Sequence, residues 1–260
     1  MISAAFASRR SEGRAALVPY FTAGHPSVDS TVDVLSALSE AGADVIELGI
    51  PFSDPLADGP TIQKSSFDSL ANGTTVEGVL RDLADFRSSH GTPVVLFTYL
   101  NPVLRHGIDA FLREAAEAGA NGLLLTDLPT GADPELEGRI VASDLDLIRL
   151  IAPTTPLERV PRVAEGGSGF VYYISRTGVT GARHELREEL HDEIRAIQDA
   201  VDLPVAVGFG ISTPEQAAAV GTVADGVVVG SALVQRLGDE GIDRGAAFIR
   251  SLRDGLDAGR

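Results

Sequence analysis

The sequence predicts an α/β protein, a (β/α)₈ barrel of the TIM type with extra short helices in its loops. Short runs rich in Val, Ile and Leu alternate with longer stretches that carry apolar residues at helical spacing, and eight such alternations fit within 260 residues. Barrels of this kind have about 250 residues. No Ser- and Pro-rich linker divides the chain, so we expect residues 1–260 to form a single domain.

The predicted strands are the apolar runs Leu17–Phe21, Val45–Ile50, Val94–Thr98, Gly122–Thr126, Leu147–Ile151, Phe170–Ser175, Pro204–Gly208 and Gly226–Val229. Loops rich in Gly, Pro and Asp follow them. The helices are predicted in the intervening stretches, namely Val28–Ala41, Thr61–Leu70, Thr75–Ser89, Ile108–Ala118, Pro134–Ser143, Pro156–Glu165, Leu186–Ala200, Pro214–Val220 and Ala246–Ala258. The sequence before Pro214 strongly indicates the start of a helix, because a hydroxyl residue precedes a proline and an acid in the first turn.

The alternative to a barrel is an open, doubly wound parallel sheet. Such sheets usually carry a Gly-rich fingerprint after the first strand. Here the first strand continues into Thr22-Ala23-Gly24-His25-Pro26, which lacks the G-x-G-x-x-G pattern. The barrel is therefore favoured, and we expect functional residues at the C-terminal ends of the strands and in the loops that follow them.

Composition excludes several classes of function. Lys and Arg number 21 and Asp and Glu number 37, which gives a net charge of −16. This sign disfavours binding to nucleic acid or to an anionic membrane surface. There is no cysteine, so disulfides, thiolate nucleophiles and Cys-ligated metals are excluded. The chain shows neither a secretory leader nor a membrane span, and we expect a cytoplasmic protein.

Glu47 is the first candidate for catalysis. It lies in the second predicted strand, where alternation places Val45, Glu47 and Gly49 on one face and three aliphatic residues on the other. Because the aliphatic face suits the helix layer, Glu47 is predicted to point into the barrel. Burial there would raise its pKa toward the range useful for acid/base work. The alternative is a structural Glu that pairs with an Arg from a neighbouring strand.

More carboxylates lie on the loops at the same end of the predicted barrel. Asp54 and Asp58 follow Glu47 within eleven residues on a loop stiffened by prolines, and Asp127 ends the fourth predicted strand. Each is a candidate for the active site. Each also has an ordinary alternative, because loop carboxylates often form turns or cap helices.

Three Gly-bearing segments predict an anion site, namely Gly178–Gly181, Gly208–Ser212 and Gly230–Ala232. The loops after strands seven and eight of such barrels commonly bind phosphate through backbone N–H groups and a helix N-terminus. A helix is expected to open at Ser231. Other chemistry is disfavoured: the only lysine, Lys64, lies on a predicted outer helix, so Schiff-base catalysis is not expected. The five histidines lack metal-binding spacing, and no metal is expected.

The segment Glu47–Gln63, ELGIPFSDPLADGPTIQ, closely resembles the signature of the tryptophan synthase α subunit family. Four further segments match in family order, namely Tyr20–Gly24, Ser175–Ala182, Gly208–Ser212 and Gly230–Ala232. The resemblance implies a lyase of tryptophan biosynthesis. Such an enzyme splits indole-3-glycerol phosphate into indole and glyceraldehyde 3-phosphate by a retro-aldol reaction that uses no cofactor of its own chain.

The resemblance also assigns roles to residues. Glu47 is implied as the acid/base catalyst and Asp58 as its partner at the indole nitrogen. The residues implied around the substrate are Tyr20, Phe97, Leu124, Ile151, Tyr172, Thr180 and Phe209. Those implied at the phosphate are Gly181, Gly210, Gly230 and Ser231.

A partner is implied as well, namely a β subunit that carries pyridoxal phosphate and receives the indole. The implied assembly is an αββα heterotetramer, and Asp54 and Asn101 are matched to loops that face the partner. The segment Arg176–Leu190 matches a lid, with Thr180 reaching Asp58 or the active site when the lid closes.

Two alternatives remain open at this point. The first is another barrel enzyme that handles phosphorylated sugars, such as indoleglycerol-phosphate synthase, which resembles this chain in its phosphate loops but depends on barrel lysines. The second is a barrel that has lost turnover and serves only as a regulatory subunit. The presence of both Glu47 and Asp58 argues against the second.

Overall fold

The computed structural model describes residues 1–175, 188–208 and 210–258. Their strands form one parallel sheet in the order β5-β4-β3-β2-β1-β9-β8-β7-β6. The strands are β1 (Ala16–Thr22), β2 (Ile46–Gly49), β3 (Val94–Thr98), β4 (Gly122–Leu125), β5 (Asp146–Leu147), β6 (Arg149–Ile151), β7 (Val171–Ile174), β8 (Val205–Gly208) and β9 (Gly226–Val229). β1 pairs with both β2 and β9, so the first and last strands are neighbours.

The ring closes at a break within the fifth predicted run. β5 pairs with β4 and β6 pairs with β7, and only Ile148 separates β5 from β6 along the chain. Eight predicted strands therefore become nine, because one is divided. The strands form a nearly closed ring, which rules out the open doubly wound sheet and confirms the predicted barrel.

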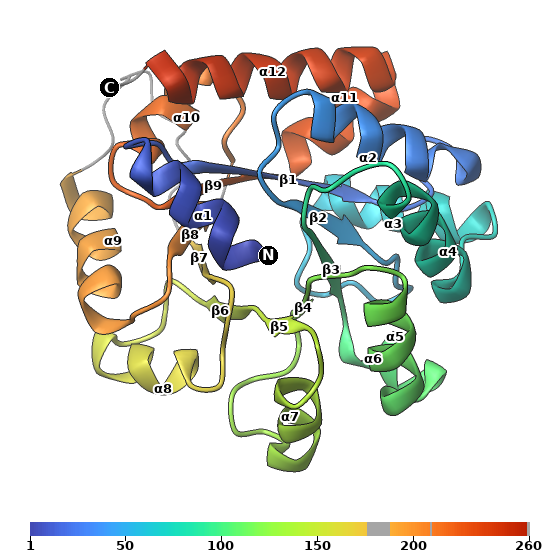
Figure 1. The fold of residues 1–260 in the computed structure, drawn as a ribbon, viewed down its shortest axis with the longest axis horizontal. Helices are drawn as coiled ribbons and strands as arrows, with labels where there is room; N and C mark the ends of the chain where they lie inside the picture. The colour runs from blue at the N-terminus through green and yellow to red at the C-terminus, as the bar shows by residue number, and fades with distance from the viewer. Residues whose placement is uncertain (176–187, 209, 259–260) are drawn as a thin grey trace.

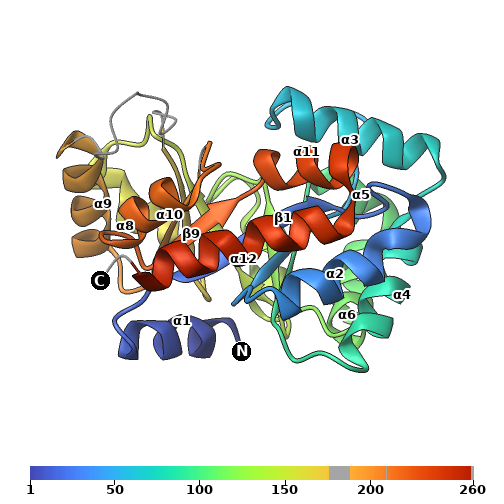
Figure 2. The same ribbon diagram turned by 90° about the horizontal axis from the view of Figure 1, so that it is seen from above.

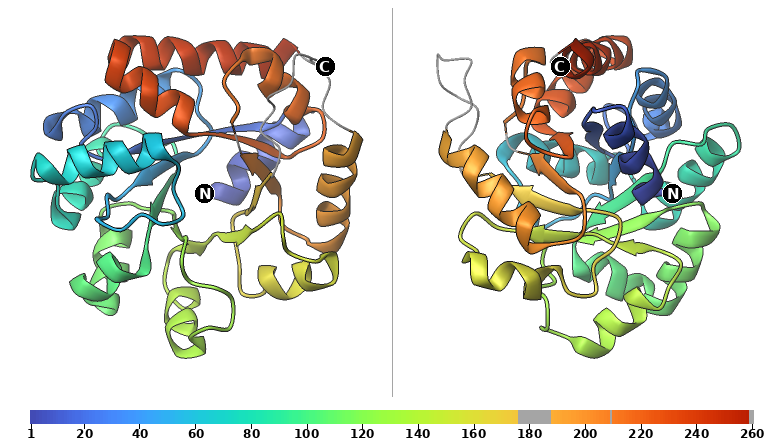
Figure 3. Two further views of the ribbon diagram at one scale, coloured as in Figure 1. Left: turned by 180° about the vertical axis from the view of Figure 1, so that it is seen from behind. Right: turned by 60° about the vertical axis from the view of Figure 1, so that its left-hand side comes forward.

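Helices surround the strands in all views (Figures 1 and 3). They are α1 (Ile2–Ser11), η1 (Val28–Ser30), α2 (Thr31–Glu40), α3 (Pro60–Ala71), α4 (Val76–Arg87), α5 (Leu100–His106), α6 (Ile108–Glu117), α7 (Pro134–Val141), η2 (Leu157–Arg159), α8 (Val160–Ala164), α9 (Glu188–Ala200), α10 (Pro214–Gly221), α11 (Ser231–Glu240) and α12 (Ile242–Ala258). The expected cap forms at α10, where the Thr213 hydroxyl accepts a hydrogen bond from the Gln216 amide at 3.3 Å. The sequence analysis did not predict α1 or α5.

The apolar residues divide into two clusters, as alternation along the strands requires. The larger cluster contains Ile46 and Leu48 and lies largely between the strands and the helices. The smaller cluster fills the interior of the ring and consists of Ile2, Phe6, Ala16, Val18, Val45, Val95, Leu124, Ile148, Phe170, Ala206 and Val228. Because Val45 faces the interior, Glu47 two residues later shares that face.

The first helix, α1, covers the N-terminal end of the barrel (Figures 1 and 2). Its Phe6 ring stacks on Phe170 with the ring centroids 5.2 Å apart. Gly122 and Gly226 begin β4 and β9, and a Cβ atom at either position would overlap Ile2 or Phe6. Since the described residues of α1 fill this end with apolar side chains, we expect a polar ligand to enter the barrel at its C-terminal end.

A buried ion-pair network fastens α1 and α12 to the same end. Asp44, just before β2, accepts hydrogen bonds from Arg9 Nε at 2.6 Å, from the Leu17 amide at 2.8 Å and from Arg253 Nη1 at 2.9 Å. The Arg253 and Asp44 side chains are each 8 % exposed. Three distant parts of the chain therefore meet at one carboxylate, where each charge has a partner of opposite sign.

Candidate active site

Glu47 lies inside the barrel, where the described residues offer it no polar partner. Its residue is completely buried, and neither carboxyl oxygen has a hydrogen-bond partner among the described residues. The alternative of an ion pair with a neighbouring Arg is therefore wrong within the described part of the chain. A buried carboxyl without partners resists ionisation, and burial raises the pKa of Glu47 to about 8.

Two tyrosines stand around this carboxyl group. Tyr20 on β1 is paired in register with Glu47, and Tyr172 lies on β7. Each phenol reaches over a glycine of the adjacent strand: the Tyr20 hydroxyl lies over Gly49, and the Tyr172 hydroxyl lies over Gly208. Any Cβ at these glycines would overlap the hydroxyl. The glycines thus make room for polar groups inside the barrel.

Asp58 lies on the loop between β2 and α3, where a neighbouring loop holds it. The Tyr99 hydroxyl donates to Asp58 Oδ2 at 3.0 Å and accepts from the Ala57 amide at 2.9 Å. Gln63 Nε2 on α3 donates to the Asp58 carbonyl at 2.9 Å. One phenol therefore fixes both the backbone and the carboxylate of this loop.

The two acids differ in protonation. Partial burial raises the pKa of Asp58 to about 6, and the hydrogen bond from Tyr99 opposes the rise. At pH 7 Asp58 is therefore mostly an anion, whereas Glu47, with its pKa of about 8, keeps its proton. Glu47 and Asp58 both interact electrostatically with Tyr20. Two acids of one site held in opposite protonation states can supply a proton donor and a fixed negative charge.

Tyr99 is a functional candidate that the sequence analysis did not assign. Nothing local in the sequence connects position 99 with position 58. The available signal was its place directly after β3, at the C-terminal end of the barrel. Phe52 on the Asp58 loop contacts the Tyr99 ring at a centroid distance of 5.1 Å. This apolar contact adds to the hydrogen bonds by which Tyr99 holds the loop.

The described residues of the predicted phosphate site lie at the ends of two neighbouring strands. Gly210 follows β8 and has φ +71°, a conformation that favours glycine. Gly230 follows β9 and is the N-cap of α11, and Ser231 is the first residue of that helix and is exposed. A helix N-terminus presents unpaired N–H groups that favour an anion. Gly181 lies outside the described residues.

The residues expected to line the substrate lie at different places in the barrel. Leu124 belongs to the inner cluster, and the Phe97 ring packs edge-on against Tyr20 with the centroids 5.0 Å apart. Ile151, at the end of β6, is buried in the larger cluster. Thr180 and Phe209 lie outside the described residues, as does the segment 176–187 that contains most of the expected lid.

Other side chains considered from the sequence have structural roles. Asp127 Oδ1 accepts a hydrogen bond from the Leu100 amide at 2.7 Å, so it caps the neighbouring loop. His25 turns toward α11, where its Nε2 lies 2.9 Å from the Val234 carbonyl oxygen. Lys64 is exposed on α3 and pairs with Asp68 at 2.5 Å, well removed from the barrel interior.

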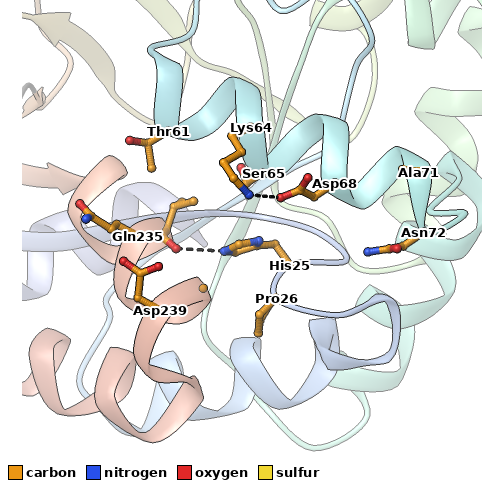
Figure 4. A pocket seen from close by; sticks show the side chains of 12 residues that line it. His25, Pro26, Thr61, Lys64, Ser65, Asp68, Ala71, Asn72, Gln235 and Asp239 are labelled. Atoms are coloured by element: carbon orange, nitrogen blue, oxygen red, sulfur yellow. Dashed lines mark hydrogen bonds and ion pairs between the residues drawn. The ribbon is translucent and has the colours of Figure 1, made fainter.

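A separate pocket of about 540 Å³ lies between α3 and α11 (Figure 4). Its walls include His25, Lys64, Asp68, Gln235 and Asp239, and neither Glu47 nor Asp58 lines it. It is therefore distinct from the candidate site at the C-terminal end of the barrel.

Among the described residues, no group of three or more His, Cys, Asp or Glu side chains is placed to hold a metal ion. Within those residues no helix is long and apolar enough to cross a membrane.

Comparison with known proteins agrees with this arrangement. Residues 6–253 match the family model described as the tryptophan synthase alpha chain. The chain belongs to the tryptophan synthase alpha chain family. It is 47 % identical over 257 residues to the tryptophan synthase alpha chain of Synechococcus elongatus, covering 98 % of this chain and 97 % of that one. The corresponding chain of Geobacter sp. strain M21 is 47 % identical over 259 residues, with the same coverage.

Solved structures of the tryptophan synthase alpha chain family have the same fold. The chain superposes on a crystal structure of tryptophan synthase from M. tuberculosis, in its aminoacrylate-bound form, with a TM-score of 0.89, 37 % identity and 98 % of both chains covered. The alpha subunit from Legionella pneumophila str. Paris gives a TM-score of 0.90 at 36 % identity, also over 98 % of both chains. The family resemblance, the barrel and the function of a tryptophan synthase alpha chain, a lyase, are thereby confirmed.

Proposed function

We propose that Glu47 and Asp58 carry out the cleavage of indole-3-glycerol phosphate to indole and glyceraldehyde 3-phosphate. The observation that carries this assignment is the pair itself. A fully buried carboxyl group with no hydrogen-bond partner among the described residues lies inside the barrel, and a second acid of lower pKa lies on the adjacent loop. Leaving a polar group buried and unpaired is costly, so such a group persists where a ligand or a reaction uses it.

The reaction needs two proton movements at neighbouring atoms. In the first, the protonated Glu47 gives its proton to the indole carbon that bears the glycerol chain, which leaves a positive charge on the ring. In the second, the Glu47 carboxylate takes the proton of the adjacent chain hydroxyl. The carbon–carbon bond then breaks, its electron pair returns to the ring, and the chain leaves as an aldehyde. Glu47 ends protonated, ready for another cycle.

Asp58 stabilises the charged intermediate of this sequence. As an anion it accepts a hydrogen bond from the ring N–H, which becomes more acidic once the ring is protonated. The hydrogen bond from Tyr99 keeps the carboxylate in place and favours its ionised form. Because the charge on Asp58 exists before the reaction begins, it costs no reorganisation when the ring becomes positive.

The rest of the substrate is assigned to the predicted subsites. The phosphate is held by the backbone of Gly210 and Gly230 and by Ser231 at the start of α11, with Gly181 of the segment outside the described residues. The aromatic ring lies among Phe97, Leu124 and the neighbouring side chains. No cofactor is needed in this chain, because both proton transfers use Glu47.

We also propose that a β subunit docks against the loops at this end of the barrel, in an αββα assembly, with the pyridoxal phosphate held by the partner. Asp54 and Asn101 are both exposed there. Two apolar side chains nearby in sequence are exposed with them, Leu56 at 82 % and Leu104 at 50 %. If a partner covers these loops, both leucines leave the solvent on association, which favours binding. We place the complete enzyme in the cytoplasm.

The substitution Glu47→Gln tests the assignment, because Gln keeps the shape of the side chain and cannot carry the proton. We expect the rate of indole release to fall by about 100-fold or more. Folding supplies a control. Burial keeps Glu47 protonated up to about pH 8 in the folded state, against 4.5 as its ordinary value, so wild-type stability falls as pH rises through this window.

The Gln variant lacks that alkaline loss, so its melting temperature at pH 8 is expected to equal or exceed that of the wild type. A variant that is stable and inactive supports the assignment. A variant that releases indole as fast as the wild type contradicts it, and an inactive variant that melts earlier at pH 8 contradicts the buried, protonated state on which the assignment rests.

A further inference from the structure

Tyr20 occupies the stretch of barrel wall between the catalytic and the phosphate positions. β1 lies between β2, which carries Glu47, and β9, which ends at Gly230. On one side Tyr20 is in register with Glu47 and its hydroxyl reaches over Gly49. On the other, a Cβ built on Gly230 would lie 3.5 Å from the Tyr20 ring. A chain that links a group at Glu47 to a phosphate at Gly230 must therefore pass Tyr20.

The Tyr20 hydroxyl is poorly satisfied where it lies. The residue is 5 % exposed, and in the described part of the chain its hydroxyl has a single hydrogen-bond contact, with Thr22 Oγ1 at 3.4 Å, near the limit for a hydrogen bond. Burying a hydroxyl without a good partner costs free energy, and a phenylalanine of the same shape avoids that cost. The Tyr20 ring also packs against the apolar ring of Phe97.

The direction of the hydrogen bonds around Tyr20 follows from proton counting. Ser65 Oγ donates its single hydrogen to the Ile62 carbonyl at 2.9 Å. Thr22 must then be the donor in its 2.7 Å contact with Ser65. Thr22 in turn can only accept from Tyr20. The phenol therefore gives its hydrogen to a long, weak bond and keeps its oxygen lone pairs free to accept from a ligand.

We propose that the Tyr20 phenol recognises a hydroxyl of the substrate's glycerol chain, and so selects a hydroxylated chain over a plain alkyl one. This inference rests on the proposed function. The phenol oxygen accepts the hydrogen of a chain hydroxyl, or exchanges its weak bond to Thr22 for a shorter one to that oxygen. Burial raises the pKa of Tyr20 far above neutrality, so the group stays an uncharged phenol throughout.

The test combines one substitution with one change to the ligand. Tyr20→Phe removes only the hydroxyl. The ligand counterpart is 3-(indol-3-yl)propyl phosphate, which has the ring, the three-carbon chain and the phosphate but no chain hydroxyl. We measure KM and kcat for indole-3-glycerol phosphate and the inhibition constant of the propyl phosphate. The matched control is Tyr173→Phe, because the Tyr173 hydroxyl donates to Glu193 on α9, in the helix layer, at 2.7 Å.

For Tyr20→Phe we expect KM for the natural substrate to rise by about three- to tenfold, the worth of one hydrogen bond. The inhibition constant of the propyl phosphate should change by less than about twofold, since that ligand has no chain hydroxyl to form a hydrogen bond with Tyr20. Tyr173→Phe should change neither. An unchanged KM in Tyr20→Phe overturns the inference, as does an equal loss for both ligands, which would assign Tyr20 a packing role. Failure of the wild type to release indole would instead overturn the proposed function.

Discussion

Tyr99→Phe isolates the contribution of one phenol to the charge on Asp58. Phenylalanine keeps the ring that contacts Phe52 and removes the hydroxyl that donates to Asp58 Oδ2 at 3.0 Å. The pKa of Asp58 is about 6 with this bond in place, and the bond holds it down. Its loss must therefore raise the pKa further, so that Asp58 becomes harder to ionise.

The rise in the pKa of Asp58 can be worked out from the free energy of its hydrogen bond with Tyr99. A hydrogen bond to a charged group contributes about 1.5–3 kcal/mol, and one pKa unit corresponds to about 1.4 kcal/mol. Asp58 is only partly buried, so we take the lower end, a rise of about one unit, from about 6 to about 7. At pH 6 the ionised fraction then falls from about one half to about one eleventh, roughly a fivefold loss. At pH 8 the loss is only about a tenth.

The assay is the pH profile of kcat/KM for indole release. In the wild type we expect a bell, with an acid limb set by Asp58 near pH 6 and an alkaline limb set by Glu47 near pH 8. Tyr99→Phe should move the acid limb up by about one unit and leave the alkaline limb in place. Tyr173→Phe serves as the control. An unmoved acid limb would refute the role of Tyr99, and a loss of equal size at every pH would show that the phenol positions the loop without tuning the charge.

Two predictions concern stability at the opposite end of the barrel. Asp44→Ala removes one carboxylate partner from the buried Arg253 and leaves Arg9 with Glu12 alone, so we expect the free energy of unfolding to fall by about 3 kcal/mol in urea titrations. A loss below about 1 kcal/mol would mean that the network adds little. Phe6→Ala removes the ring that stacks on Phe170 and should cost about 3–5 kcal/mol. Both variants should keep the wild-type kcat at temperatures where they are folded. A large fall in kcat there would show that packing at the N-terminal end of the barrel affects the active site.

Much of the fold was predictable because it depends on local patterns. Alternation along Val45–Ile50 separated an inner from an outer face, and the structure places Glu47 on the inner one. The helix α1 was not predicted, because it lacks a clear local pattern. Its apolar residues Ile2 and Phe6 form too short a pattern to stand out, and they are buried only because the ring leaves an open end for them to fill.

The division of the fifth strand also depends on the ring. A continuous apolar run, Leu147–Ile151, looks like one strand, yet β5 and β6 pair with different neighbours around Ile148. Arg149 lies within that run, and its side chain makes a buried ion pair with Glu137 at 2.5 Å. Its partner lies on α7, which the closed ring places against this strand, and no local pattern marks that contact.

The order of residues along the chain was sufficient to specify the alternating strands and helices and the motif around Glu47 and Asp58, since both are written in short stretches of neighbouring positions. The chemical state of those two acids depends on the folded chain. Among the described residues Glu47 has no hydrogen-bond partner, because the inner face of the barrel is built mainly from apolar side chains, and the pKa of Asp58 is held down by a phenol 41 positions away. A pKa depends on distances in space, and folding sets those distances by bringing remote segments together.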